Sequence, residues 1–180
     1  HKKSISGPGV GNYLTMAKAL AAIRGIVGEE GIRHGGLVQA HGTGTPQNRV
    51  TESEILSRTA AAFGIEDWPV VAPKCFLGHS IGSAAGDQIS STLGIWQHGV
   101  LPGITTIDAV AEDVSQQHLS FSNAHRDIDT GAQQYAIINS KGFGGNNATA
   151  TLLSPVTTQR MLRARYSDSD WAAWERANES

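Results

Sequence analysis

Segments with helical periodicity alternate along this chain with short apolar runs, and glycine or proline separates one from the next. Residues 13–27 place apolar side chains about every 3.6 positions, which predicts an amphipathic helix that is broken from Gly28 onward. The same reasoning predicts helices over residues 51–63 and 81–98, and strands over residues 37–40, 70–72, 119–121, 135–138 and 148–153. This alternation predicts an α/β fold, in which a mixed β-sheet is layered between α-helices.

The character of the sequence changes at Pro155. We therefore divide the chain into a main domain over residues 1–154 and a C-terminal helical extension over residues 155–180. In the extension, a serine and aspartate cluster over residues 167–170 is typical of a helix start, and Trp171 and Trp174 then share one helix face. Because exposed tryptophan pairs are uncommon on isolated domains, we expect this helix to dock through them on its own protein, with a partner as the alternative.

Composition excludes several classes of function. A net charge of −2 without a long basic run argues against nucleic-acid binding. No apolar stretch approaches the roughly 20 residues of a membrane-spanning helix. A single cysteine excludes an internal disulfide framework and favours the cytoplasm. Because the chain begins at His1 without a methionine, in a segment that resembles a loop, we expect it to be a piece of a longer protein.

Two histidines stand in glycine-rich segments at the ends of predicted strands. His41 follows the first predicted strand and is followed by Gly42-Thr43-Gly44, whereas His79 follows Gly78 a few residues after Lys74. Glycine beside a reactive side chain lets the backbone approach a ligand closely, and two imidazoles can donate hydrogen bonds to one oxygen of a carbonyl or thioester. The alternative is that these histidines belong to ordinary turns, because a lone His-Gly-x-Gly is a weak signal.

Three segments together carry a resemblance to a known family. They are residues 39–46 with Glu52 eleven residues after His41, residues 74–80, and residues 139–148. In order and spacing they resemble the C-terminal half of a β-ketoacyl synthase, a condensing enzyme of the thiolase superfamily, over roughly residues 4–153. The resemblance implies a thiolase-like half that packs against an N-terminal half through helices, within a homodimer.

The resemblance also implies a reaction, in which an acyl group on a cysteine undergoes decarboxylative Claisen condensation with malonyl-acyl carrier protein. His41 and His79 would stabilise the thioester oxygen as carbon dioxide leaves, and Lys74 would pair with Glu52 in a buried polar network. The acyl carrier protein would be the partner and would deliver its phosphopantetheine arm, so no bound cofactor is expected. No metal is expected either, because the histidines lack ligand spacing. The alternative for Lys74 and Glu52 is a surface lysine and a first-turn helix charge.

The third segment would supply a separate donor. By the same resemblance, the backbone N–H of Phe143 would stabilise the tetrahedral intermediate, and its ring would gate the acyl pocket. Gly144 and Gly145 would free the chain to present that amide.

The nucleophile of such an enzyme is missing from this chain. The only thiol is Cys75, beside Lys74, whereas the family's reactive cysteine lies in the preceding half. We therefore expect an acyltransferase half that is inactive alone. Two alternatives stay open: a non-catalytic structural or dimerisation half of a heterodimer, and a cysteine hydrolase that uses Cys75 with a histidine.

Several positions depart from the family pattern. Arg49 replaces an aspartate, Lys141 a phenylalanine, Asn146 a threonine and Ala85 a glycine, and Gln88 stands where elongating bacterial fatty-acid synthases have glutamate. These changes leave the expected catalytic set intact but alter the polar surroundings of the pocket. They suggest a divergent synthase that takes short starters, and leave open whether it serves fatty-acid or polyketide assembly.

Overall fold

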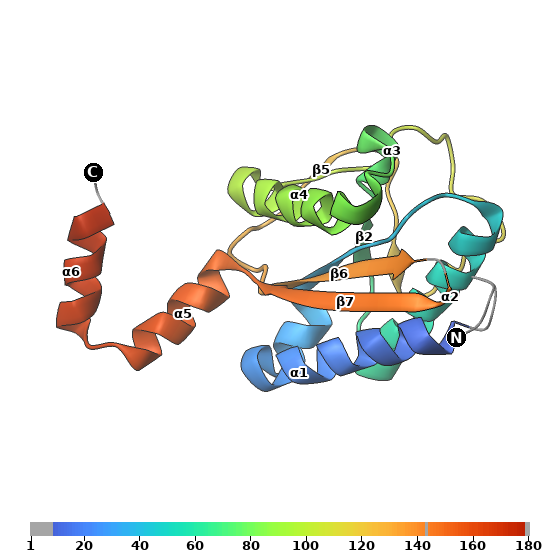
Figure 1. Ribbon diagram of the computed structural model, residues 1–180. Coiled ribbons are helices and arrows are strands. Elements are labelled where there is room, and N and C mark those ends of the chain that lie inside the picture. Colours follow the sequence, from blue (N-terminus) through green and yellow to red (C-terminus); the bar gives the residue numbers. More distant parts are fainter. Residues whose placement is uncertain (1–8, 143, 179–180) are drawn as a thin grey trace.

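The computed structural model describes residues 9–142 and 144–178. Its main sheet has five strands in the order β4-β2-β1-β6-β7 (Figure 1). Their bounds are β1 Gly36–Gln39, β2 Trp68–Val71, β4 Leu119–Ser120, β6 Tyr135–Gly142 and β7 Asn146–Leu153. Strands β4, β2, β1 and β6 run parallel, and β7 runs antiparallel to β6. The predicted mixed α/β sheet is confirmed.

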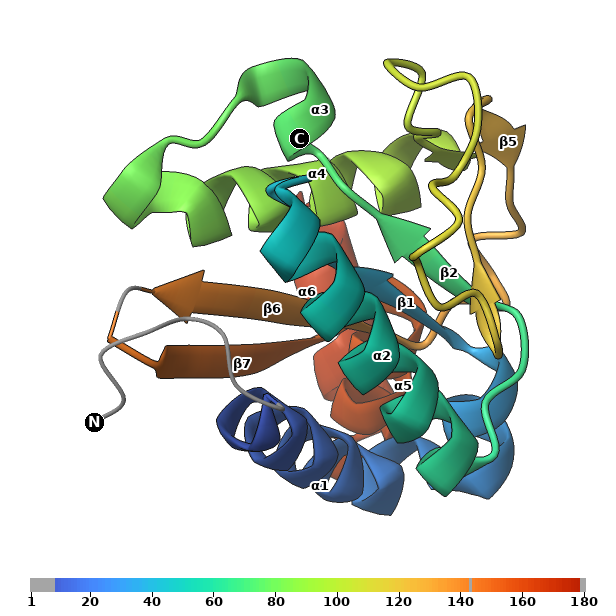
Figure 2. The same ribbon diagram turned by 90° about the vertical axis from the view of Figure 1, so that its right-hand side faces the viewer.

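Helices cover both faces of this sheet. Figures 1 and 2 show α1 and α4 on opposite sides of β6, and α2 lies on the α1 side. The helices of the main domain are α1 Val10–His34, α2 Pro46–Phe63, the single turn α3 Lys74–Leu77, and α4 Ala84–His98, which a 3-10 turn over Ile81–Ser83 precedes. A two-stranded antiparallel ribbon, β3 Val100–Leu101 with β5 Arg126–Asp127, adjoins the α4 layer.

The alternation of side chains along the strands creates two apolar cores. Val38 and Ile137 pack with α1 and α2, whereas the preceding residues Leu37 and Ala136 pack with α4. Because both faces of β1 and β6 are covered, these strands are buried throughout their paired region. The sheet is therefore a rigid support whose strands β1 and β2 end beside the candidate site.

The first two helices are longer than predicted. Helix α1 passes through Gly28, which adopts φ 75° and ψ 178° and kinks the helix, and it continues to His34. Helical turns resume because the apolar stripe continues to the fully buried Ile32. Helix α2 begins at Pro46 and not near residue 51, since proline is well accommodated in the first turn of a helix.

The last strand pair is also longer than predicted. Strand β6 extends to Gly142 and β7 begins at Asn146, so residues 139–142, taken above as part of a glycine-rich segment, are paired in the sheet. Cross-strand hydrogen bonding between two long neighbours decides this extension, which the periodicity of one strand does not show.

The C-terminal extension forms two helices, α5 Pro155–Arg165 and α6 Asp168–Asn178 (Figure 1). The expected helix start is confirmed, because Ser167 Oγ accepts a hydrogen bond from the backbone N–H of Asp170. The Trp171 and Trp174 rings lie 4.9 Å apart between centroids, with Trp171 buried and Trp174 half exposed. The two tryptophans therefore differ in role, because Trp171 is packed within the extension and Trp174 leaves half its surface in solvent.

Candidate functional site

His41 lies directly beyond β1, at the point where the chain turns toward α2. Ala40 still bonds to the β2 carbonyl of Val71, and the loop then turns at Gly42, which has φ 56°. A Cβ at Gly42 would lie 3.1 Å from the Ala72 side chain, tighter than an ordinary contact, and the positive φ also favours glycine there. The strand end and this glycine hold His41 in place with only 8% of its surface exposed.

His79 reaches the same place from a different segment. It follows α3, and the chain changes direction between α3 and His79 at Gly78, which has φ 72° and ψ −165°. The ring centroids of His41 and His79 are 5.2 Å apart, with the ring planes at 80°. The expected convergence of the two imidazoles is therefore found.

Backbone amides orient both imidazole rings in the same way. The N–H of Lys141 donates to Nδ1 of His41 at 3.4 Å, and the N–H of Ile81 donates to Nδ1 of His79 at 3.1 Å. A neutral imidazole whose Nδ1 accepts a hydrogen bond carries its proton on Nε2. Each ring is thus held in the form that presents an Nε2–H donor.

Burial keeps the His41 imidazole neutral. It lowers the pKa of His41 to about 4, and the positive charges of Lys74 and Lys141 act in the same direction, whereas the negative charge of Glu52 opposes them. At neutral pH His41 can therefore donate from Nε2 without carrying a charge.

The Glu52 carboxylate fixes the loop that carries His41. Its oxygens accept hydrogen bonds from the backbone N–H groups of His41 at 2.7 Å and Gly42 at 2.9 Å. They also accept from the side-chain amides of Asn48 at 2.9 Å and Asn139 at 2.7 Å. Four donors from α2, β6 and the His41 loop therefore surround a carboxylate that is 4% exposed.

The expected direct ion pair between Lys74 and Glu52 is wrong. No such pair joins them, because the carboxylate is already occupied by its four N–H donors. Within the described residues the Lys74 ammonium is buried without a hydrogen-bond partner. Burial lowers the pKa of Lys74, and the charge of Glu52 only partly offsets this effect.

Two members of this network were not anticipated. Asn48 stands one helical turn before Glu52, a spacing that places both on one face of α2, and its side-chain oxygen accepts from the Lys141 ammonium at 2.9 Å. Asn139 belongs to the third segment of the resemblance, but the sequence does not show that its amide reaches Glu52 from β6.

Gln88 occupies a second buried polar position beneath the site. Its side-chain Nε2 lies 3.2, 2.7 and 3.1 Å from the carbonyl oxygens of Gln39, Ala40 and Asn139. The first two carbonyls lie at and just beyond the C-terminal end of β1, and the third lies within β6. The Gln88 amide therefore ties α4 to the strands that carry the site.

The third segment is described only in part. Phe143 lies outside the described residues. Gly144 and Gly145 adopt φ 79° and 78° in the turn that joins β6 to β7, conformations that favour glycine.

A cavity of about 880 Å³ opens beside the two histidines. His41, His79, Lys74, Cys75 and Lys141 line it together with apolar side chains of the chain between β3 and β4. Burial raises the pKa of the Cys75 thiol, which argues against a thiolate nucleophile.

Among the described residues, no group of three His, Cys, Asp or Glu side chains is placed to hold a metal ion. No helix in the part of the chain that the structure describes is long and apolar enough to cross a membrane.

Comparison with known proteins gives consistent results. Residues 15–108 match the family described as "Beta-ketoacyl synthase, C-terminal domain". The beta-ketoacyl-[acyl-carrier-protein] synthase FabY of Pseudomonas aeruginosa is 55% identical over 96% of this chain and 27% of its own length. The 3-oxoacyl-[acyl-carrier-protein] synthase 1 of Escherichia coli is 29% identical over 64% of this chain and 26% of its own length.

Solved structures show the same fold. The crystal structure of the P. aeruginosa ketosynthase FabY matches with a TM-score of 0.92 and covers 97% of this chain and 27% of that protein. An oxazolomycin ketosynthase domain from Streptomyces albus matches with a TM-score of 0.73 over 86% of this chain and 27% of its own, at 20% identity, which bears on the fold alone.

The layered mixed sheet and the paired histidines define a thiolase-like domain of the condensing-enzyme class. The chain belongs to the β-ketoacyl synthase family and carries its C-terminal domain. It spans about a quarter of the length of the relatives reported above.

Proposed function

We propose that this chain is the C-terminal part of a β-ketoacyl synthase, an acyltransferase that condenses an acyl thioester with malonyl-acyl carrier protein. One observation carries the proposal, namely that His41 and His79 each hold an Nε2–H donor beside one cavity. Two preorganised neutral donors are suited to an oxygen that becomes negatively charged during the reaction.

The proposed reaction begins with the malonyl thioester. The bond between its carboxylate and the α-carbon breaks, carbon dioxide leaves, and the electron pair forms an enolate whose oxygen accepts hydrogen bonds from His41 and His79. The enolate carbon then attacks the acyl group held on a cysteine of the preceding half, and the thiolate leaves after the new carbon–carbon bond closes. The attack forms a tetrahedral intermediate at the acyl carbonyl before the thiolate leaves. The backbone N–H of Phe143, with Gly144 and Gly145 beside it, is proposed to donate a hydrogen bond to the oxygen of this intermediate.

Lys74 and Glu52 have supporting roles in this proposal. Glu52 positions His41 through the loop amides, as described above. The buried Lys74 ammonium lines the same cavity and would attract the malonyl carboxylate.

The surface of α4 supports an N-terminal half as partner. A Cβ at Gly82, Gly86 or Gly94 would meet nothing within 4 Å, and the nearby Leu93 and Ile81 are 55% and 78% exposed. Such an apolar face with little side-chain bulk suits close packing of a second helical layer. The resemblance adds the acyl carrier protein, with its phosphopantetheine arm, and a homodimer to the proposal. The single cysteine adds a cytoplasmic location.

The proposal is tested by release of carbon dioxide from malonyl-acyl carrier protein by the full-length protein. We expect His41→Ala and His79→Ala each to slow decarboxylation about 10²–10³-fold, the usual cost of one lost oxyanion donor. His34→Ala is the matched control, because His34 is exposed at the end of α1. Decarboxylation that survives both substitutions at the control rate would contradict the proposed role.

Acyl transfer separates catalysis from a structural role. Mass spectrometry of the full-length protein after incubation with an acyl-carrier-protein thioester should locate the acyl group on a cysteine upstream of this chain. Absence of any acylated cysteine there would favour the non-catalytic half.

A further inference from the structure

The chain between β3 and β4 forms one wall of the cavity beside the histidines. Residues 102–118 contain neither helix nor strand, and their apolar side chains Ile104, Ile107, Val110 and Val114 line the cavity. A wall without regular secondary structure depends for its position on contacts with its neighbours.

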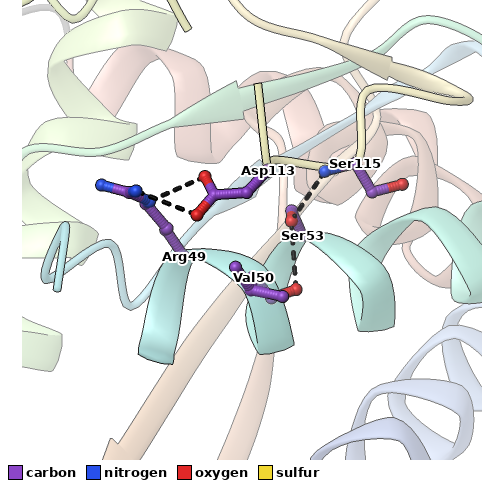
Figure 3. Close-up of polar contacts among 5 residues, drawn as sticks. All are labelled: Arg49, Val50, Ser53, Asp113 and Ser115. Carbon is purple, nitrogen blue, oxygen red and sulfur yellow. Dashed lines mark hydrogen bonds and ion pairs between the residues drawn. The ribbon is translucent and has the colours of Figure 1, made fainter. Parts of the chain in front are cut away.

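Helix α2 holds this wall at two adjacent points (Figure 3). Arg49 donates from Nε and from a terminal guanidinium nitrogen to the two oxygens of Asp113, each at 2.9 Å. One turn further along α2, Ser53 Oγ accepts from the backbone N–H of Ser115 at 3.0 Å and donates to the carbonyl of Val50 at 3.2 Å. The two-bond fork fixes the orientation as well as the distance of Asp113.

These contacts are the hydrogen bonds that join this part of the wall to its neighbours. Within the described residues, hydrogen bonds from outside the wall reach residues 109–115 only at Asp113 and Ser115. The next anchor is at Asp108, whose carbonyl accepts from the Asn123 side chain at 3.1 Å. Loss of the Arg49 fork would therefore free the segment between Asp108 and Ser115.

The same turn of α2 also fixes the opposite side of the cavity. Glu52, between Arg49 and Ser53 in sequence, holds the loop that carries His41. The first half of α2 thus sets the distance between the histidine side and the apolar wall.

We propose that Arg49 is a positioning residue for the substrate: its fork to Asp113 holds the wall over residues 102–118 against α2 and sets the width of an apolar channel for the thioester-linked chain. This inference rests on the proposed function. The apolar lining suits a hydrocarbon chain. The Arg49–Asp113 pair lies at the edge of the cavity, with side chains 36% and 45% exposed.

Three variants of the full-length protein test this role. Arg49→Gln should raise the amide exchange rate of Val114, whose N–H donates to the Ala111 carbonyl within this segment, about three- to fivefold, as expected for the loss of a partly exposed ion pair. It should weaken binding of a hexyl-pantetheine thioether by a similar factor, while kcat changes less than about twofold. Arg49→Asp combined with Asp113→Arg should restore both values. Arg163→Gln, which removes the exposed pair of Arg163 with Glu175 in the extension, is the matched control.

The outcomes separate this role from the proposed function. Faster exchange and weaker thioether binding, both restored by the charge swap, would support the positioning role even if the wild-type protein showed no condensation, which would overturn only the proposed function. Unchanged exchange or unchanged thioether affinity in Arg49→Gln would overturn the positioning role.

Discussion

Replacing Glu52 by glutamine tests how the site is held together. The carboxylate accepts four N–H donors, from the backbone of His41 and Gly42 and from the amides of Asn48 and Asn139. A glutamine side chain has one oxygen, so two of these donors would face an NH₂ group and lose their acceptor. Each carboxylate oxygen serves one loop amide and one asparagine amide, so the loop carrying His41 loses one hydrogen bond to a charged group, which costs about 1.5–3 kcal/mol.

Hydrogen exchange measures this change locally in the full-length protein. The amides of His41 and Gly42 should exchange at least about tenfold faster in Glu52→Gln, because about 1.4 kcal/mol corresponds to a factor of ten. Decarboxylation should fall with it, since His41 is no longer held. Glu54→Gln is the matched control, because Glu54 lies on the exposed side of the same helix. A change below about 1 kcal/mol at these amides, or one equal to that of the control, would refute the reasoning.

Three further predictions concern His41, Gln88 and Cys75. Burial lowers the pKa of His41 from 6.5 to about 4, so the unfolded chain binds a proton before the folded chain does as the pH falls. The stability that neutral His41 contributes is therefore complete above about pH 6.5 and is lost as the pH falls to about 4. Melting temperatures of wild type and His41→Asn should therefore converge over this interval, and a constant difference would contradict the assignment. Gln88→Leu should lower the free energy of unfolding by about 2 kcal/mol or more, since the two N–H groups shared among three buried carbonyls are lost; an unchanged denaturation midpoint would be inconsistent with this. Cys75→Ala should leave condensation within about twofold of wild type, because its raised pKa keeps the thiol protonated, whereas a loss above tenfold would point to the hydrolase alternative.

Local patterns predicted the elements more reliably than their ends. The helix over residues 13–27 is part of α1, but Gly28 only kinks it, because burial of Ile32 outweighs the cost of one left-handed residue. Helix α2 begins at a proline, earlier than its acidic residues indicated. Strands β6 and β7 are longer than predicted because each is stabilised by the other.

The partners of individual polar groups were predicted less well. The convergence of His41 and His79 followed from the motifs and is found, but the expected Lys74–Glu52 ion pair is wrong, since four N–H donors surround the carboxylate. Spacing along a chain shows which groups are near one another. It does not show how many other donors compete for the same oxygen.

The sequence by itself determined the class of fold and the two histidine segments, because apolar periodicity and glycine positions are properties of short stretches of chain. Only the tertiary structure decided that backbone amides donate to Nδ1 of both His41 and His79. The same is true of the hydrogen bond from Asn139 to Glu52 and of the ion pair between Arg49 and Asp113. Each of these contacts joins residues from separate elements, except the local bond at His79. Their geometry therefore depends on how the sheet and helices pack, and no local pattern specifies it.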